Sequence, residues 1–127
     1  MNKAHNPSSI APPFKNRYSH GIEVSAGSRM LFTAGTVGVK PDGAVPESFA
    51  EQVDTVMKSL TEILKSAGMG WDDVVKLNGY LTPKGDVPTF AEVRAKYLTH
   101  KPAMTVVYVP ALVDPRWMVE VEVVAAR

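Results

Sequence analysis

The chain has 127 residues, enough for one domain with a buried core and too few for two ordinary domains. Hydrophobic residues make up 45% and charged residues 21%, which is typical of a globular protein and not of a disordered one. Lys and Arg total 14 against 13 Asp and Glu, so the charge balance gives no support for a nucleic-acid partner. The absence of cysteine excludes disulfides, thiolate metal sites and a Cys nucleophile.

The first residues lack the apolar core of a signal peptide, and no run approaches the roughly 18 apolar residues of a membrane span. We therefore expect a cytoplasmic protein with no membrane segment. Residues 1–17 contain Pro7, Pro12 and Pro13 and are typical of an extended arm or loop. We expect this arm to begin a single domain that spans residues 1–127.

Two short strands follow the arm. Residues 19–25 alternate and place Ile22 and Val24 on one face, and residues 29–35 are a second apolar candidate. The Ala-Gly-Ser run at 26–28 separates them. Because two strands joined by a short Gly-containing loop are typical of a hairpin, we predict that these two strands pair.

The clearest helix signal begins at Ser48, which is followed three residues later by Glu51, a capping-box pattern. Apolar residues then recur at spacings of three and four and form one stripe. That stripe comprises Phe49, Val53, Val56, Met57, Leu60, Ile63, Leu64 and Ala67. Gly68 stands where a left-handed C-terminal cap is expected. The stripe predicts a helix that packs on a sheet.

The second half of the chain alternates strand and helix. Residues 74–82 are typical of a strand, residues 87–98 of a helix, and residues 102–110 and 117–125 of two closing strands. The last strand places Glu120 and Glu122 among valines. Carboxylates in such a strand require a hydrogen-bond or charge partner, so we expect the two closing strands to help build any site.

This order of elements predicts a two-layer α+β domain with both helices on one face of a single mixed sheet. Apolar side chains remain for the other face, because the following residues cannot all face the helices: Phe32, Val106, Tyr108, Met118 and Val124. A sheet with two apolar faces and helices for only one of them favours self-association. We therefore expect a homo-oligomer packed sheet to sheet.

Seven segments, in order, resemble one known family. They are Tyr-Ser-His-Gly at 18–21, Phe-Thr-Ala-Gly-Thr at 32–36, Phe-Ala-Glu-Gln at 49–52, the run at 67–76 with Asp-Asp-Val-Val-Lys, the helix at 89–97, Pro-Ala-Met-Thr at 102–105 and Val-Glu-Val-Glu-Val-Val-Ala at 119–125. The chain is similar in these segments to the RidA/YjgF family, also called L-PSP or reactive-intermediate deaminases. The resemblance covers nearly the whole length from Tyr18 onward.

The resemblance implies a chorismate-mutase-like fold and a homotrimer in which three sheets form a barrel, with small-molecule clefts between subunits. It also implies hydrolysis of enamine or imine intermediates, such as 2-aminoacrylate, to a 2-keto acid and ammonia. No metal and no organic cofactor takes part in that reaction.

The family's site residues are only partly matched. Glu120 stands at the position of a glutamate near the water that attacks the imine carbon, Tyr18 at that of a pocket tyrosine, and Gly35 at that of a strand-end glycine. Met104 replaces the arginine that grips the substrate carboxylate, and Arg94 replaces an asparagine. Because a thioether cannot bind a carboxylate, we expect a pocket adapted to a more apolar ligand or to one anchored elsewhere.

Several alternatives stay open for these residues. Arg94, Arg116 or Arg17 could replace the missing arginine, although most arginines are solvated surface residues. Glu120 is either a general base or a solvated carboxylate at a subunit boundary. For Glu122 we expect a structural ion pair rather than a ligand-binding role.

The remaining polar residues give weaker signals. His20 could reach a ligand beside the early tyrosine, but His5, His20 and His100 lack the spacing of metal ligands. We expect the adjacent carboxylates of Asp72 and Asp73 to cap a helix or strand and not to form a catalytic pair.

The leading hypothesis is an imine or enamine deaminase in which Glu120 activates water and 2-aminoacrylate is not the main substrate. The alternative is a non-enzymatic small-molecule-binding or interaction protein of the same fold. Some family members are described as ribonucleases, and the near-neutral charge gives that third hypothesis little support.

Overall fold

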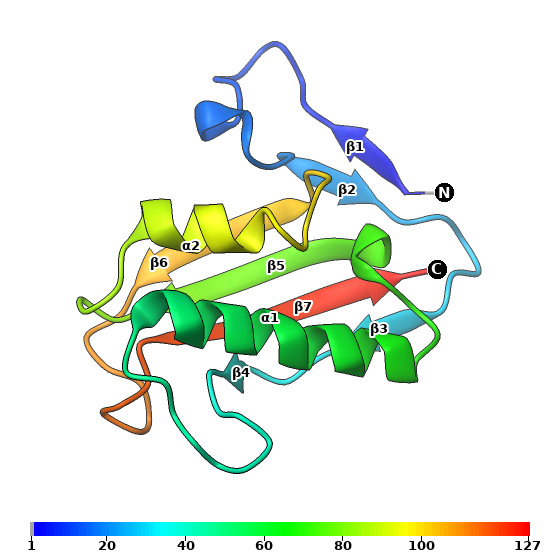
Figure 1. Ribbon diagram of the computed structural model, residues 1–127. Helices are drawn as coiled ribbons and strands as arrows, with labels where there is room; N and C mark the ends of the chain where they lie inside the picture. The colour runs from blue at the N-terminus through cyan, green and yellow to red at the C-terminus, as the bar shows by residue number, and fades with distance from the viewer. Residues whose placement is uncertain (1) are drawn as a thin grey trace.

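The computed structural model describes residues 2–127 and shows two helices on one face of a mixed five-stranded sheet (Figure 1). The helices are α1, Phe49–Ser66, and α2, Val87–Arg94. The strands of this sheet are β3 (Met30–Phe32), β4 (Thr36–Val37), β5 (Val74–Leu81), β6 (Ala103–Tyr108) and β7 (Val119–Ala126). The predicted α+β architecture with both helices on one face is confirmed.

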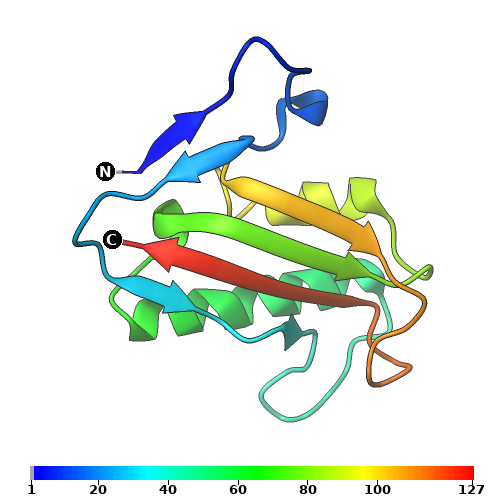
Figure 2. The ribbon, with the colours of Figure 1, turned by 180° about the vertical axis from the view of Figure 1, so that it is seen from behind.

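The sheet is built around β5, which pairs in parallel with β6 and antiparallel with β7. The strand order is β3-β7-β5-β6, and β4 pairs with β7 beyond the end of β3. The helix α2 connects the parallel strands β5 and β6, as a parallel pair requires. Seen from behind, these strands form a surface that neither helix covers, which we call the open face (Figure 2).

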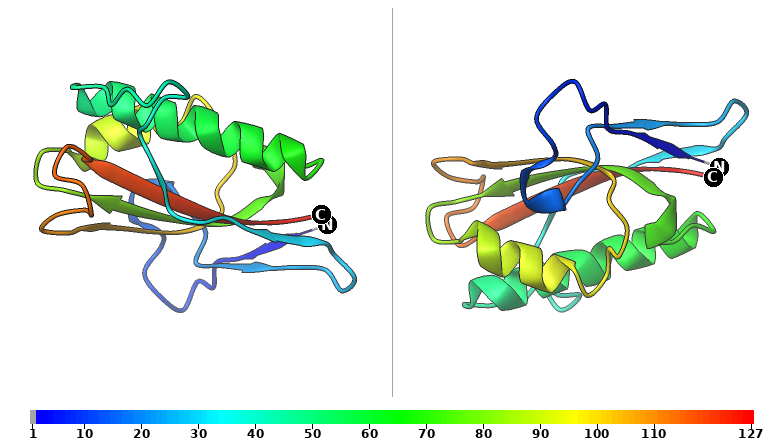
Figure 3. Two further views of the ribbon diagram at one scale, coloured as in Figure 1. Left: turned by 90° about the horizontal axis from the view of Figure 1, so that it is seen from below. Right: turned by 90° about the horizontal axis from the view of Figure 1, so that it is seen from above.

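The predicted hairpin between residues 19–25 and 29–35 is wrong. β2, Gly21–Glu23, pairs with β1, Lys3–His5, inside the predicted arm, and the two form a separate two-stranded sheet. β3 pairs instead with β7, where Phe32 lies opposite Val124. The β1–β2 ribbon lies on the side of the main sheet away from the helices (Figure 3). Pairing with β7 lets Leu31 pack against the core, and a local hairpin would not provide that burial.

The caps of α1 follow the sequence signals. The Ser48 hydroxyl accepts a hydrogen bond from the Glu51 backbone N–H at 3.1 Å, and Gly68 adopts a φ of +69°. Gln52 lies on the buried face, a position that the apolar stripe did not indicate. Its Nε2 donates to the carbonyls of Pro46 and Arg116, and its Oε1 accepts from the Met118 N–H. This single side chain joins α1 to the loops before α1 and before β7.

The second helix is shorter than the predicted range of 87–98. The Asp86 carboxylate caps α2 by accepting from the Thr89 N–H at 2.7 Å. Turns follow its last residue and lead to Leu98, which is buried. A Cβ on Gly79 of β5 would lie 3.1 Å from Cζ of Phe90, so the absence of a side chain there lets α2 pack closely on the sheet.

Alternation along the strands separates the two faces of the sheet. Val119, Val121, Val123 and Ala125 of β7 are buried under the helices together with Leu77 of β5 and the α1 stripe. Val106 also packs against this core. Phe32 is 70% exposed and Val107 42% exposed on the open face. No helix within residues 2–127 is long and apolar enough to cross a membrane.

Candidate functional site

Glu120 and Gly35 lie together on the open face. Glu120 is on β7, opposite Val37 of β4 and Tyr80 of β5. A Cβ built on Gly35 would lie only 2.7 Å from Oε2 of Glu120. Any side chain at position 35 would therefore push against the carboxylate, and glycine lets the carboxylate lie against the backbone.

The two carboxylates of β7 have different surroundings. Glu122 Oε1 accepts hydrogen bonds from the Tyr80 hydroxyl at 2.9 Å and from Nδ2 of Asn78 at 3.1 Å. The hydrogen bond to Glu122, followed by burial and the charges of Glu122 and Glu120, raises the pKa of Tyr80. The Glu120 carboxylate accepts no hydrogen bond from any residue between 2 and 127. Glu122 is therefore held by neutral donors instead of the expected ion pair, while Glu120 is free to bind water or a ligand.

Met104 and Arg94 form a second group, on the helix side of the sheet. Met104 lies on β6 beside Leu77 and packs against the core. Nη1 of Arg94 donates to Sδ of Met104 at 2.8 Å. The Arg94 guanidinium carbon lies 5.6 Å from the centre of the Phe90 ring. The structure thus brings together the two positions at which the sequence resemblance implied other residues.

Arg94 is a largely buried cation without an acidic partner. It is 8% exposed, and in the described part of the chain no carboxylate oxygen lies within 4.0 Å of its guanidinium nitrogens. Burial, with a smaller contribution from the charge of Arg17, lowers the pKa of Arg94. Of the three arginines considered as replacements for the anchor, Arg94 contacts Met104 and Arg17 lies close to Arg94, whereas Arg116 pairs with Asp114 at 2.9 Å.

Tyr18 lies beside the start of β6. The next residue, Ser19, donates its backbone N–H to the Pro102 carbonyl at 3.0 Å, which fixes this segment to β6. The Tyr18 hydroxyl accepts from the Phe14 N–H at 3.2 Å, and its ring meets the His20 ring edge-on at 5.9 Å. His20 in turn contacts the Ala11 carbonyl through Nε2 at 2.8 Å.

One chain does not unite these groups in a single pocket. Glu120 and Gly35 lie on the open face, whereas Met104 and Arg94 lie on the helix side. In the sheet, Glu120 is two strands from β6, and its register partner Tyr80 is three residues from the partner of Met104. At about 4.8 Å per strand and about 3.3 Å per residue, the positions are more than roughly 12 Å apart. A site that uses both groups therefore needs a second copy of the chain.

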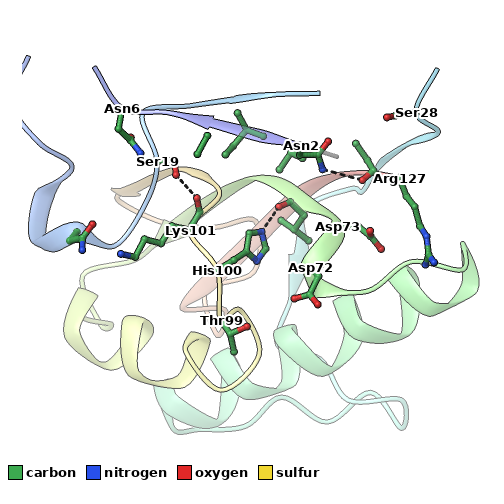
Figure 4. Close-up of a pocket in the computed structure, with 16 residues that line it drawn as sticks. Asn2, Asn6, Ser19, Ser28, Asp72, Asp73, Thr99, His100, Lys101 and Arg127 are labelled. Atoms are coloured by element: carbon green, nitrogen blue, oxygen red, sulfur yellow. Dashed lines mark hydrogen bonds between the residues drawn. The ribbon is translucent and has the colours of Figure 1, made fainter. Parts of the chain in front are cut away.

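A cavity of about 750 Å³ lies between the β1–β2 ribbon and the end of the main sheet nearest the C-terminus (Figure 4). Its walls include Asp72, Asp73, His100 and Lys101, and none of the site residues expected from sequence. Asp73 accepts from the Gly70 N–H at 2.9 Å, in agreement with the predicted cap. His100 Nε2 lies 2.7 Å from the Val74 carbonyl oxygen. The Asp73 and His100 side chains therefore hold the backbone.

A second cavity, of about 360 Å³, adjoins the C-terminal end of α2. Its lining includes Arg17, Arg94 and Lys101, and residues 99–101 border both cavities. Lys101 gave no signal in the sequence, because a basic residue before a strand is ordinarily a solvated side chain. Its proximity to Arg94 depends on the turn that follows α2.

Comparison with known proteins identifies the family. Residues 8–127 match the family model described as Endoribonuclease L-PSP. Protein HMF1 of Saccharomyces cerevisiae is 35% identical to this chain, over 92% of this chain and 89% of its own length. The 2-iminobutanoate/2-iminopropanoate deaminase of Mus musculus is 29% identical, over 95% of this chain and 85% of its own length.

Solved structures agree with these matches. The Rid-family protein YyfB of Yersinia pestis superposes with a TM-score of 0.85 at 27% identity, covering 99% of this chain and 98% of its own. TdcF of E. coli, solved with bound serine, has a TM-score of 0.72 at 28% identity, covering 96% of this chain and 93% of its own. The fold, the family model and the curated relatives together show that this chain belongs to the Endoribonuclease L-PSP family, which is also known as the RidA/YjgF family.

Proposed function

We propose that this protein hydrolyses a reactive imine or enamine to a carbonyl product and ammonia. The observation that carries the proposal is the Glu120 carboxylate, which lies against Gly35 on the open face and accepts no hydrogen bond from the described residues. The names of related proteins support the reaction class. They include 2-iminobutanoate/2-iminopropanoate deaminases of mouse and rat and the chloroplastic Reactive Intermediate Deaminase A of Arabidopsis thaliana.

In the proposed mechanism Glu120 acts first as a general base. Its carboxylate takes a proton from a water molecule, and the water oxygen bonds to the carbon of the protonated C=N group. The protonated Glu120 returns its proton to the nitrogen of the resulting carbinolamine, the C–N bond breaks, and ammonia leaves while the hydroxyl proton passes to the Glu120 carboxylate as the carbonyl forms. One water is consumed for each imine, and neither a metal nor an organic cofactor is needed. An enamine enters the same sequence after it tautomerises to the imine.

We further propose that the site lies between subunits of a homotrimer. Glu120 and Gly35 of one subunit would face Met104, Arg94 and Tyr18 of the next, because a single chain keeps these groups apart. The exposed apolar residues of the open face support burial against another copy. With Met104 in place of an arginine, we propose that 2-aminoacrylate is not the main substrate and that the substrate is larger or more apolar.

The test of the reaction is ammonia release from freshly generated imines. An amino-acid oxidase produces imines in situ from a panel of apolar amino acids, and the rate above spontaneous hydrolysis is measured. Loss of a general base costs about 10²–10⁴-fold, so Glu120→Gln should reduce the enzymatic rate by about that factor. Glu62→Gln, which changes an exposed carboxylate on α1, is the matched control. A Glu120→Gln protein as active as the wild type would exclude the proposed mechanism.

A second candidate is a non-enzymatic ligand-binding protein of the same fold. Met104, at the position of the carboxylate-gripping arginine, favours it. This candidate predicts no ammonia release with any imine of the panel, together with saturable binding of a small molecule. Ribonuclease activity follows from the family description alone, and cleavage of a labelled single-stranded RNA would test it.

A further inference from the structure

The 360 Å³ cavity beside α2 carries an unusual set of charges. Three basic side chains line it, namely Arg17, Arg94 and Lys101, against one acidic side chain, Glu92. The rest of the wall comprises Pro88, Ala91, Ala95, Leu98, Thr99 and His100. The whole chain, in contrast, is nearly neutral, with 14 basic and 13 acidic residues. The positive charge is therefore concentrated locally.

Arg94 is the central group of this cavity. Its side chain is held by the Met104 sulfur, at 2.8 Å from Nη1, and by the face of the Phe90 ring. A guanidinium group has five N–H donors, and the sulfur is a weak acceptor for one of them. A buried cation is ordinarily paired, because desolvation without a partner costs several kcal/mol. The surroundings of Arg94 between residues 2 and 127 supply no such anion.

Arg17 and Lys101 add further uncompensated positive charge to this cavity. Arg17 is half-buried and lies close enough for its charge to lower the pKa of Arg94. Lys101 extends away from Asp72 and Asp73, which face the other cavity (Figure 4). Neither Arg17 nor Lys101 forms an ion pair with any residue from 2 to 127. The three like charges outnumber the single carboxylate of Glu92 in the wall, and an anion that enters the cavity would reduce their mutual repulsion.

We propose that this cavity binds a small oxyanion, a carboxylate or a phosphate group, with Arg94 as its principal ligand and Arg17 and Lys101 as supporting cations. The planar fork of a guanidinium group matches both anions with paired N–H donors. Met104 allows this arrangement because a thioether, unlike a second guanidinium, can lie against Arg94 without charge repulsion. The inference shares Arg94 with the proposed intersubunit site, and anion binding is measured without the proposed reaction.

The test measures anion binding to the full chain without turnover. Inorganic phosphate and acetate are titrated separately by calorimetry at constant ionic strength, and thermal unfolding is followed in parallel. The wild type is expected to bind at least one of them saturably and to unfold at a higher temperature in its presence. Arg94→Gln and Arg17→Gln should each weaken binding by about tenfold or more. Arg29→Gln removes an exposed arginine that does not line the cavity, and it should bind like the wild type.

The outcomes separate the sources of the anion and the two proposals. Tighter binding of phosphate identifies a phosphorylated ligand, and tighter binding of acetate identifies a carboxylic acid. Absence of saturable binding by both anions, or equal binding by wild type, Arg94→Gln and Arg17→Gln, would overturn the inference. Ammonia release without anion binding would remove only this inference, and anion binding without ammonia release would remove only the proposed reaction.

Discussion

At the scale of single residues, the pair Met104 and Arg94 distinguishes this chain from the family pattern. The sequence resemblance implies an arginine on the strand and an asparagine on the helix, whereas this chain has a thioether on the strand and an arginine on the helix. The contact of 2.8 Å between Nη1 and Sδ shows that the two substitutions meet in space. Arg94 on α2 therefore places a positive charge against the strand position of Met104.

This contact predicts that the two positions are coupled. Met104→Arg alone should lower the free energy of unfolding by about 2 kcal/mol or more, because it places a second guanidinium beside a buried one. Adding Arg94→Asn, which gives both family residues, should recover most of that loss. Urea unfolding of the wild type, both single variants and the double variant measures the coupling. Additive effects of the two changes would show that the side chains do not interact.

The double variant should also gain function. With the strand arginine restored and the competing charge removed, ammonia release from 2-aminoacrylate should rise above that of Met104→Arg. A double variant that is stable but does not exceed the single variant would show that the departure from the family extends beyond this pair.

At the scale of secondary-structure elements, a polar contact joins α1 to the turn that follows α2. The Tyr97 hydroxyl, just after α2, donates to Oδ1 of Asp54 on α1, and Lys58 pairs with the same carboxylate at 3.0 Å. The hydrogen bond from Tyr97 is the largest cause that lowers the pKa of Asp54. Burial, followed by the Asp54 contact, raises the pKa of Tyr97 to about 12, so its hydroxyl keeps the proton at neutral pH.

Tyr97→Phe should therefore destabilise the protein in a pH-dependent way. The folded pKa of Asp54 is below the ordinary value of 3.8, so its stabilising contribution is complete above that pH and is lost as the pH falls through the folded pKa. We expect a loss of about 1 kcal/mol at pH 7 that shrinks below about pH 4. Tyr108→Phe is the control, because the Tyr108 hydroxyl accepts from the Val87 N–H and not from an acid. Equal losses for Tyr97→Phe at pH 7 and pH 3 would contradict this account.

At the scale of the whole molecule, the open face is the feature that the single chain does not explain. On the open face, Phe32 is 70% exposed beside the hydrogen bonds that Glu122 accepts. On the opposite face, the helices bury the valines of β7. An apolar residue of this size on a sheet face indicates contact with another protein surface. The proposed intersubunit site makes a second copy of this chain the natural partner.

Phe32→Asp should dissociate the proposed homotrimer. A carboxylate cannot be buried without a partner, so sedimentation should show the mass fall from about three times 13.8 kDa to that of one chain. Ammonia release should fall with it, because each site would lose the groups supplied by the neighbour. Val113→Asp, at a loop position that is 92% exposed, should leave both the mass and the activity unchanged. A Phe32→Asp protein with the wild-type mass would argue against assembly through this face.

Local physical chemistry made much of the fold predictable from the sequence. The helix stripe, the Ser48 cap and the Gly68 cap depend on residues a few positions apart, so α1 was expected within about one turn. Alternating valines around two glutamates likewise indicated β7 and its two faces. The order of these elements, with the family's segments, determined the two-layer architecture.

The tertiary structure alone decided which strands and side chains meet. Residues 19–25 and 29–35 carry equally good local signals, and only the burial of Leu31 and the presence of the long strand β7 select the partner of β3. The contacts of Glu120 with Gly35 and of Arg94 with Met104, like the three hydrogen bonds of Gln52, join positions from different elements. Such contacts depend on how elements pack, and packing energies are sums over the whole core that no local pattern contains.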